Sequence, residues 1–94
     1  MGMARELVFI TVIGQDRKGI VARIATYLFK RDINIEDISQ KITEGYFVMT
    51  MLVDMADSRW SIEKISAELA SLGADLNLKI QVQHENIFRM MHRV

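Results

Sequence analysis

Residues 7–13 read LVFITVI, a run in which only Thr11 carries a polar side chain. The run is rich in β-branched residues and shorter than an ordinary buried helix, so it predicts a strand. Odd and even positions are both apolar, which means that both faces of this strand must be covered. We therefore place it in the middle of a sheet, and the rest of the chain must supply the cover.

The pattern changes to helical spacing after this strand. Gly14 is expected to end the strand, and residues 14–19 (GQDRKG) to form a polar loop. Apolar residues then recur every three or four positions, which predicts a first helix over residues 18–30. Asp16 or a neighbouring loop group is the expected N-cap, because a short acceptor side chain can satisfy an N–H group of the first turn.

A second strand is predicted over residues 33–42, with a defect in its alternation. Its apolar positions are odd up to Ile35 and even from Ile38 onward. A strand changes parity only through an extra residue, so we expect a bulge near Glu36 and Asp37. Glu44-Gly45 then forms a turn into a third strand, residues 46–53 (YFVMTMLV), which is again apolar on both faces.

A second helix is predicted over residues 62–72. Ser61 is the expected N-cap, Trp60 and Ile65 occupy the hydrophobic-staple positions, and Gly73 is the expected stop. Residues 76–83 alternate strictly between apolar and polar, which is typical of a half-exposed edge strand.

The tail, residues 84–94, is predicted to form a short amphipathic helix. Its apolar residues recur at helical spacing, namely at Ile87, Met90, Met91 and Val94.

The order βαββαβ predicts an α+β fold, the ferredoxin-like sandwich. Its antiparallel sheet has four strands in the order 4-1-3-2, with two helices on one face and here a C-terminal helical tail. The chain is then one domain over residues 1–94, with a disordered start at 1–5, a core at 6–83 and the tail at 84–94. Both central strands are apolar on both faces, so the tail, a partner subunit or both must cover the second face.

Composition narrows the class of protein. The 94 residues include 12 basic and 12 acidic side chains and no cysteine. Zero net charge argues against binding nucleic acid or anionic membranes. No apolar run is long enough to span a bilayer, and no signal-type segment is seen, so we expect a soluble cytoplasmic protein.

The loop carries a resemblance to a known family. Residues 14–21 (GQDRKGIV), followed by Ile33-Asn34-Ile35, resemble the ACT domain, a small-molecule sensor attached to many enzymes of amino-acid biosynthesis. Lys18 stands where many ACT loops carry proline. Residues 37–40 (DISQ), 51–54 (MLVD) and 83–88 (QHENIF) are similar to a narrower group of stand-alone ACT proteins, distantly similar to the glycine cleavage system repressor.

The resemblance implies a regulatory function. The expected protein is a homodimer that binds a small molecule, an amino acid, and signals to a regulated partner protein. The expected ligand-binding residues are Asp16, Arg17, Gly19, Ile20 and Asn34, and ACT domains often hold the amino acid at a subunit interface. The alternative is a dimerisation module that binds no ligand.

The residues themselves allow two interpretations of this group. The first-turn N–H groups at Gly19 and Ile20 have no partner within the helix and attract an anion, so they suit a carboxylate. Asp16 can accept from an ammonium group, and Asn34 can both donate and accept. Alternatively, Asp16 caps the helix, Gly19 serves packing and Asn34 bonds a turn.

Catalysis, metal binding and cofactors are not expected. Adjacent Glu36 and Asp37 point to opposite faces unless the bulge intervenes, and His84 and His92 lack the spacing of metal ligands on one face. Arg17 alone does not provide an acylphosphatase-type site. Tyr46 and Phe47 lack the basic and glycine-aromatic signature of an RNA-recognition motif.

Overall fold

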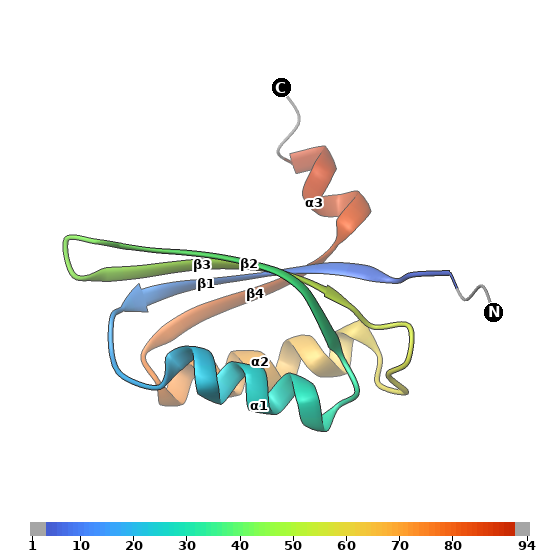
Figure 1. Ribbon diagram of the computed structural model, residues 1–94, viewed down its shortest axis with the longest axis horizontal. Coiled ribbons are helices and arrows are strands. Elements are labelled where there is room, and N and C mark those ends of the chain that lie inside the picture. The colour runs from blue at the N-terminus through green and yellow to red at the C-terminus, as the bar shows by residue number, and fades with distance from the viewer. Residues whose placement is uncertain (1–3, 92–94) are drawn as a thin grey trace.

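The structure, a computed structural model, describes residues 4–91 and forms two layers with a projecting helix (Figure 1). Two helices lie against one face of a twisted sheet, and the last helix extends from the other face. The elements in chain order are β1 (Leu7–Gln15), α1 (Ile20–Lys30), β2 (Asn34–Thr43), β3 (Tyr46–Asp54), α2 (Ile62–Asp75), β4 (Leu78–His84) and α3 (Glu85–Met91).

The sheet has the predicted strand order. Its strands lie as β2-β3-β1-β4, and every pairing is antiparallel. In the middle of β1, Ile10 pairs with Met51 of β3 on one side and Val82 of β4 on the other. The ferredoxin-like βαββαβ fold is therefore confirmed, with the two most apolar strands at the centre.

The core lies between the sheet and helices α1 and α2. Alternate residues of the central strands face the helices and are almost fully buried: Val8, Ile10, Val12, Phe47, Met49, Met51 and Val53. The helices contribute Ile24, Leu28, Ile65 and Leu69 to this core, and each of these side chains is 0% exposed. Burying one such side chain contributes about 1.5–3 kcal/mol, so this layer supplies most of the driving force for folding.

The β2–β3 hairpin matches its prediction closely. The register of β2 against β3 shifts between Ile35 and Asp37, which confirms the bulge. Glu44 and Gly45 form the turn, with φ angles of 54° and 83°. A two-residue turn with both φ angles positive twists in the sense that the strands require.

The start of α1 differs from its prediction. β1 continues through Gly14 to Gln15, and α1 begins at Ile20 with Gly19 as N-cap; no side chain caps it. Asp16 is therefore not the N-cap. Its main-chain N–H donates to the carbonyl of Gly45 at 3.0 Å, which keeps Asp16 at the end of the sheet and away from the first helical turn.

The prediction for α2 is confirmed at its N-terminus and wrong at its C-terminus. Ser61 is the N-cap, and its side chain accepts from the N–H of Lys64 at 3.1 Å, as predicted. Gly73 does not end the helix, which continues to Asp75; the left-handed residue is Asn77, with φ 57°. Gly73 is buried against β4, so packing rather than termination requires it there. Trp60 packs on the core, while its staple contact with Ile65 stays a prediction.

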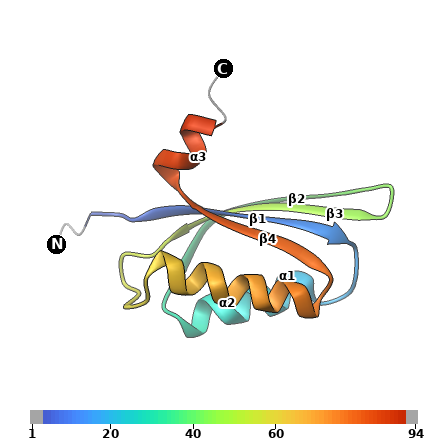
Figure 2. The ribbon, with the colours of Figure 1, turned by 180° about the vertical axis from the view of Figure 1, so that it is seen from behind.

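The second face of the sheet is only partly covered. The tail forms the predicted helix as α3, on the side opposite α1 and α2 (Figure 2). Phe88 of α3 stacks on Phe9 of β1 with ring centroids 4.0 Å apart. Ile87, Met90 and Met91, which we expect to cover either this face or a subunit interface, are 52%, 71% and 62% exposed in the single chain. His92 and Val94, and residues 1–3 of the predicted disordered start, lie outside the described residues.

Candidate functional site

The loop between β1 and α1 is held in place at two points. At one point Asp16 donates its N–H to Gly45 in the β2–β3 turn. At the other, the guanidinium of Arg17 donates to the carbonyl oxygen of Leu76 at 3.4 Å, just after α2. Arg17 therefore satisfies a carbonyl at the end of α2. The side chain of Asp16 is exposed and accepts no hydrogen bond from the described residues.

The N-terminus of α1 presents open backbone. Gly19 has φ 83°, and a Cβ placed on it would meet nothing within 4 Å. The carbonyl of Gly19 accepts from the N–H of Arg23 at 2.9 Å, which closes the first turn. The N–H groups of that turn have no carbonyl to bond within the helix and carry the positive end of its dipole. The side chain of Ile20 is 2% exposed, so only its backbone can meet a ligand.

Asn34 lies at the opposite end of the sheet from this loop. It pairs with Asp54, which pairs with Leu7 at the start of β1. Gly14 follows Leu7 by seven positions along β1, a distance of roughly 23 Å at the ~3.3 Å rise of a strand. Within one chain, the structure therefore brings Asp16, Arg17, Gly19 and Ile20 together and leaves Asn34 apart from them.

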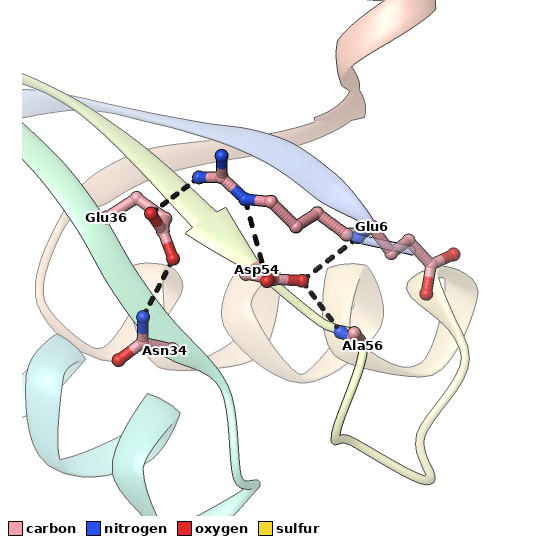
Figure 3. A network of polar contacts seen from close by, with 6 residues as sticks. Glu6, Asn34, Glu36, Asp54 and Ala56 are labelled. Atoms are coloured by element: carbon pink, nitrogen blue, oxygen red, sulfur yellow. Dashed lines mark hydrogen bonds and ion pairs between the residues drawn. The ribbon is translucent and has the colours of Figure 1, made fainter. Parts of the chain in front are cut away.

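Asn34 belongs to a polar network that the sequence did not predict (Figure 3). Its amide nitrogen donates to Glu36 Oε2 at 2.8 Å, and Glu36 Oε1 pairs with Arg5 at 2.6 Å. Arg5 also approaches Asp54 Oδ2 at 4.0 Å. Glu36 sits at the β2 bulge, and its side chain contacts both Asn34 and Arg5. No local pattern links Arg5, Glu36 and Asp54, because the sheet brings them together from distant parts of the chain.

Asp54 anchors this network to the backbone. Its Oδ1 accepts from the N–H groups of Glu6 at 3.0 Å and Ala56 at 2.9 Å. These two hydrogen bonds hold the pKa of the Asp54 carboxyl below its ordinary value of 3.8. The carboxyl group of Asp54 is therefore ionised at neutral pH. The network fixes the amide nitrogen of Asn34 and leaves its carbonyl oxygen without a hydrogen bond among the described residues.

A small cavity opens beside Asn34. Its volume is about 250 Å³, and its lining consists of Phe29, Asp32, Ile33, Asn34 and Asp57. Two carboxylates and an exposed aromatic ring in this lining suit a positively charged group.

A larger groove of about 430 Å³ runs along the outer surface of α1 and reaches Leu72 of α2. Two of its lining side chains bond Glu68 of α2. Tyr27 donates to Glu68 at 2.5 Å, and Arg31 donates to the same oxygen at 3.0 Å. Burial and the Glu68 carboxylate raise the pKa of Tyr27, and the bonds from Tyr27 and Arg31 lower that of Glu68. The cluster ties α1 to α2.

Among residues 4–91, no group of three or more histidine, cysteine or acidic side chains is placed to hold a metal ion. No helix in this part of the chain has the length and hydropathy needed to cross a membrane.

Known proteins resemble this chain over most of its length. Residues 6–83 match the model of a family described as the ACT domain. A UPF0237 protein of Methanopyrus kandleri is 47% identical over 85 residues, which cover 90% of this chain and 94% of that protein. An ACT domain protein from Streptococcus pneumoniae has a TM-score of 0.80 and 34% identity, covering 90% of this chain and 96% of that one.

A more distant structural match supports the fold alone. A repressor-like protein of the glycine cleavage system has a TM-score of 0.72 and 23% identity over 85% of this chain. This chain corresponds to 46% of that protein.

Proposed function

Because the chain belongs to the ACT domain family, we propose that it is a cytoplasmic regulatory domain that binds an amino acid as a homodimer and signals to a partner protein. ACT domains are typically regulatory domains that bind small molecules. The observation that supports a ligand here is the start of α1. It combines first-turn N–H groups that no side chain caps, a left-handed Gly19 whose missing Cβ would meet nothing within 4 Å, and the exposed carboxylate of Asp16.

These groups match the two ends of a zwitterion. The backbone N–H groups at Gly19 and Ile20 bind the carboxylate, since a helix N-terminus favours an anion by about 0.3–2 kcal/mol. Asp16 accepts from the ammonium group. Arg17 holds the loop in position through Leu76.

Asn34 can contact a ligand bound at the β1–α1 loop only if a second copy of the chain supplies it. It lies roughly 23 Å from the loop of its own chain, by the rise of the strand between them. A ligand that contacts both Asn34 and Asp16 must therefore lie between the loop of one subunit and Asn34 of the other. This arrangement makes ligand binding depend on the dimer, and it gives the ligand a means of changing how the subunits are held.

We infer no catalytic role. The carboxylates whose pKa is shifted, Asp54 and Glu68, are engaged in bonds that join elements of the fold. Neither lies at the loop, and each is held as an acceptor by two donors. Such groups stabilise structure and are poorly placed to exchange protons with a substrate.

Calorimetric titration of the full chain with the twenty amino acids, serine and glycine first, tests the proposal. A ligand of so few atoms is limited to about −1.5 kcal/mol per heavy atom at best, so micromolar to millimolar dissociation constants are expected. Saturation at a hundred times the dissociation constant should add about 2.7 kcal/mol to the free energy of unfolding.

Asp16→Ala is the informative variant. Asp16 does not cap α1, so its removal should change the free energy of unfolding by less than about 0.5 kcal/mol, as for other exposed positions. Binding should nevertheless be lost. Asp75→Ala, which removes another exposed aspartate, serves as the control and should bind as the wild type does. If no amino acid binds the wild type at millimolar concentration, the ligand-free dimerisation module replaces this proposal.

A further inference from the structure

The face of the sheet opposite α1 and α2 is apolar toward both ends of its central strands, with Thr11 of β1 paired to Thr50 of β3 between them. Odd-numbered residues of β1 point to this face, and Ile13 pairs there with Val48 of β3. Ile13 is 47% exposed and Val48 is 38% exposed, while Tyr46 beside them is 57% exposed. At the other end of β1, Phe9 is half-buried under Phe88 of α3. We call the part formed by Ile13, Tyr46 and Val48 the bare end of this face.

Helix α3 is an apolar arm with little support from its own chain. It has seven residues, of which none is buried, although Ile87, Met90 and Met91 are apolar. A helix of that length is not stable alone in water and needs tertiary contacts on its apolar side. Figures 1 and 2 show α3 directed away from the sheet, and within residues 4–91 the side chains of Ile87, Met90 and Met91 stay more than half exposed.

We propose that a second copy of this chain covers both surfaces at once, with the arm of each subunit packed on the bare end of the other. The inference deepens the homodimer proposed above by assigning its interface. In this dimer the outer faces of the two sheets face each other across a two-fold axis that is perpendicular to the strands. The strands of the two subunits therefore run in opposite directions. The arm, which stands over the Phe9 end of its own sheet, then faces the Ile13 end of the partner's sheet. The same two-fold rotation therefore covers the arm and the bare end of both subunits. This is an isologous interface, in which the two subunits use the same surface.

The size of the surface agrees with this arrangement. Four strands about 4.8 Å apart and about seven residues long cover roughly 450 Å² of sheet, and α3 of the same chain already covers the Phe9 end of this area. Stable interfaces bury about 800 Å² on each partner, so the sheet alone is too small and the arms are needed to complete it. Two lysines lie next to the bare end, since Lys41 is paired with Val48 and Lys79 is paired with Ile13. A polar rim of this kind is typical of the edge of an interface.

Two experiments on the full chain test the interface. Light scattering on a size-exclusion column should give twice the chain mass of 10.8 kDa for the wild type at micromolar concentration. Ile13→Glu and Met90→Glu should each give the mass of one chain. Phe29→Glu is the matched control: Phe29 is 79% exposed, yet lies on α1, so this variant should stay dimeric. Circular dichroism verifies that each variant is folded.

Cross-linking gives an independent readout, because the chain has no cysteine of its own. Single variants Ile13→Cys and Met90→Cys, mixed and oxidised, should form a disulfide that joins one chain of each kind. Phe29→Cys mixed with Met90→Cys should not. A monomeric wild type, or dimers that survive both glutamate variants with no Ile13–Met90 cross-link, would overturn the interface.

The two proposals fail separately. If the wild type binds an amino acid, but both glutamate variants stay dimeric and no Ile13–Met90 cross-link forms, the interface is wrong and the sensor stands. If the glutamate variants are monomeric and the cross-link forms, but no amino acid binds the wild type, the interface stands and the sensor is wrong.

Discussion

Gly73 of α2 lies so close to β4 that a Cβ placed on it would stand 2.8 Å from the carbonyl oxygen of Leu78. The same Cβ would come within 3.0 Å of the side chain of Ile80. Real Cβ atoms do not approach a carbonyl oxygen that closely, so α2 can pack at this depth only because position 73 has no side chain.

Gly73→Ala should therefore destabilise the protein, although alanine is the better helix former. At an exposed helical site this change would stabilise by about 0.8–1 kcal/mol. Here the clash should outweigh that gain, and the free energy of unfolding should fall by about 1–3 kcal/mol, as in other overpacked sites. Urea unfolding measures the change. Ser71→Ala, at an exposed position of the same helix, should stay within about 0.5 kcal/mol of the wild type. A Gly73→Ala protein as stable as the wild type would refute the packing argument.

Gly19→Ala should cost about 1–2 kcal/mol for a different reason, because the left-handed backbone is strained for a residue with a Cβ. A Cβ there meets nothing within 4 Å, so no clash contributes. Gly19→Asn should recover much of the loss, since asparagine tolerates positive φ. Thermal unfolding of the two variants compares them, and equal losses for alanine and asparagine would contradict a purely backbone origin.

Ser61→Ala should reduce the free energy of unfolding by about 1 kcal/mol, because it removes the side chain that accepts from the N–H of Lys64. Ser61→Asp restores an acceptor and should restore most of the stability. The measurement is denaturant unfolding of the three proteins. An aspartate variant no more stable than the alanine variant would count against capping.

The Glu68 cluster should make stability depend on pH in the acid range. Bonds from Tyr27 and Arg31 lower the folded-state pKa of Glu68 below its ordinary value of 4.5. The unfolded state then takes up a proton first as the pH falls, so the contribution is complete at neutral pH and is lost below pH 4.5. Free energies of unfolding from pH 7 to pH 3 should fall less steeply for Glu68→Gln than for the wild type.

Tyr27→Phe provides the control for this pH effect. It removes the O–H that donates to Glu68 and leaves the carboxyl in place. The folded-state pKa of Glu68 should move up toward its ordinary value, so the acid-dependent loss should be smaller than in the wild type. A profile steeper than that of the wild type would show that another group controls the acid response.

The sequence by itself determined the order and type of the elements, because these follow from short-range periodicity. Apolar residues on both faces of residues 7–13 demanded a central strand, and the parity change between Ile35 and Ile38 demanded the bulge. The turn at Glu44 and Gly45 and the cap at Ser61 are also local, since each depends on neighbours within a few positions.

Only the tertiary structure decided how distant segments meet. It placed Asn34 at the opposite end of the sheet from Asp16, because α1 returns the chain along the length of β1 before β2 begins. It buried Gly73 against β4, where periodicity had indicated only a helix stop, and it joined Arg5 to Glu36. These relationships depend on side chains and backbones brought together across the sheet, and no spacing along the chain encodes such distances.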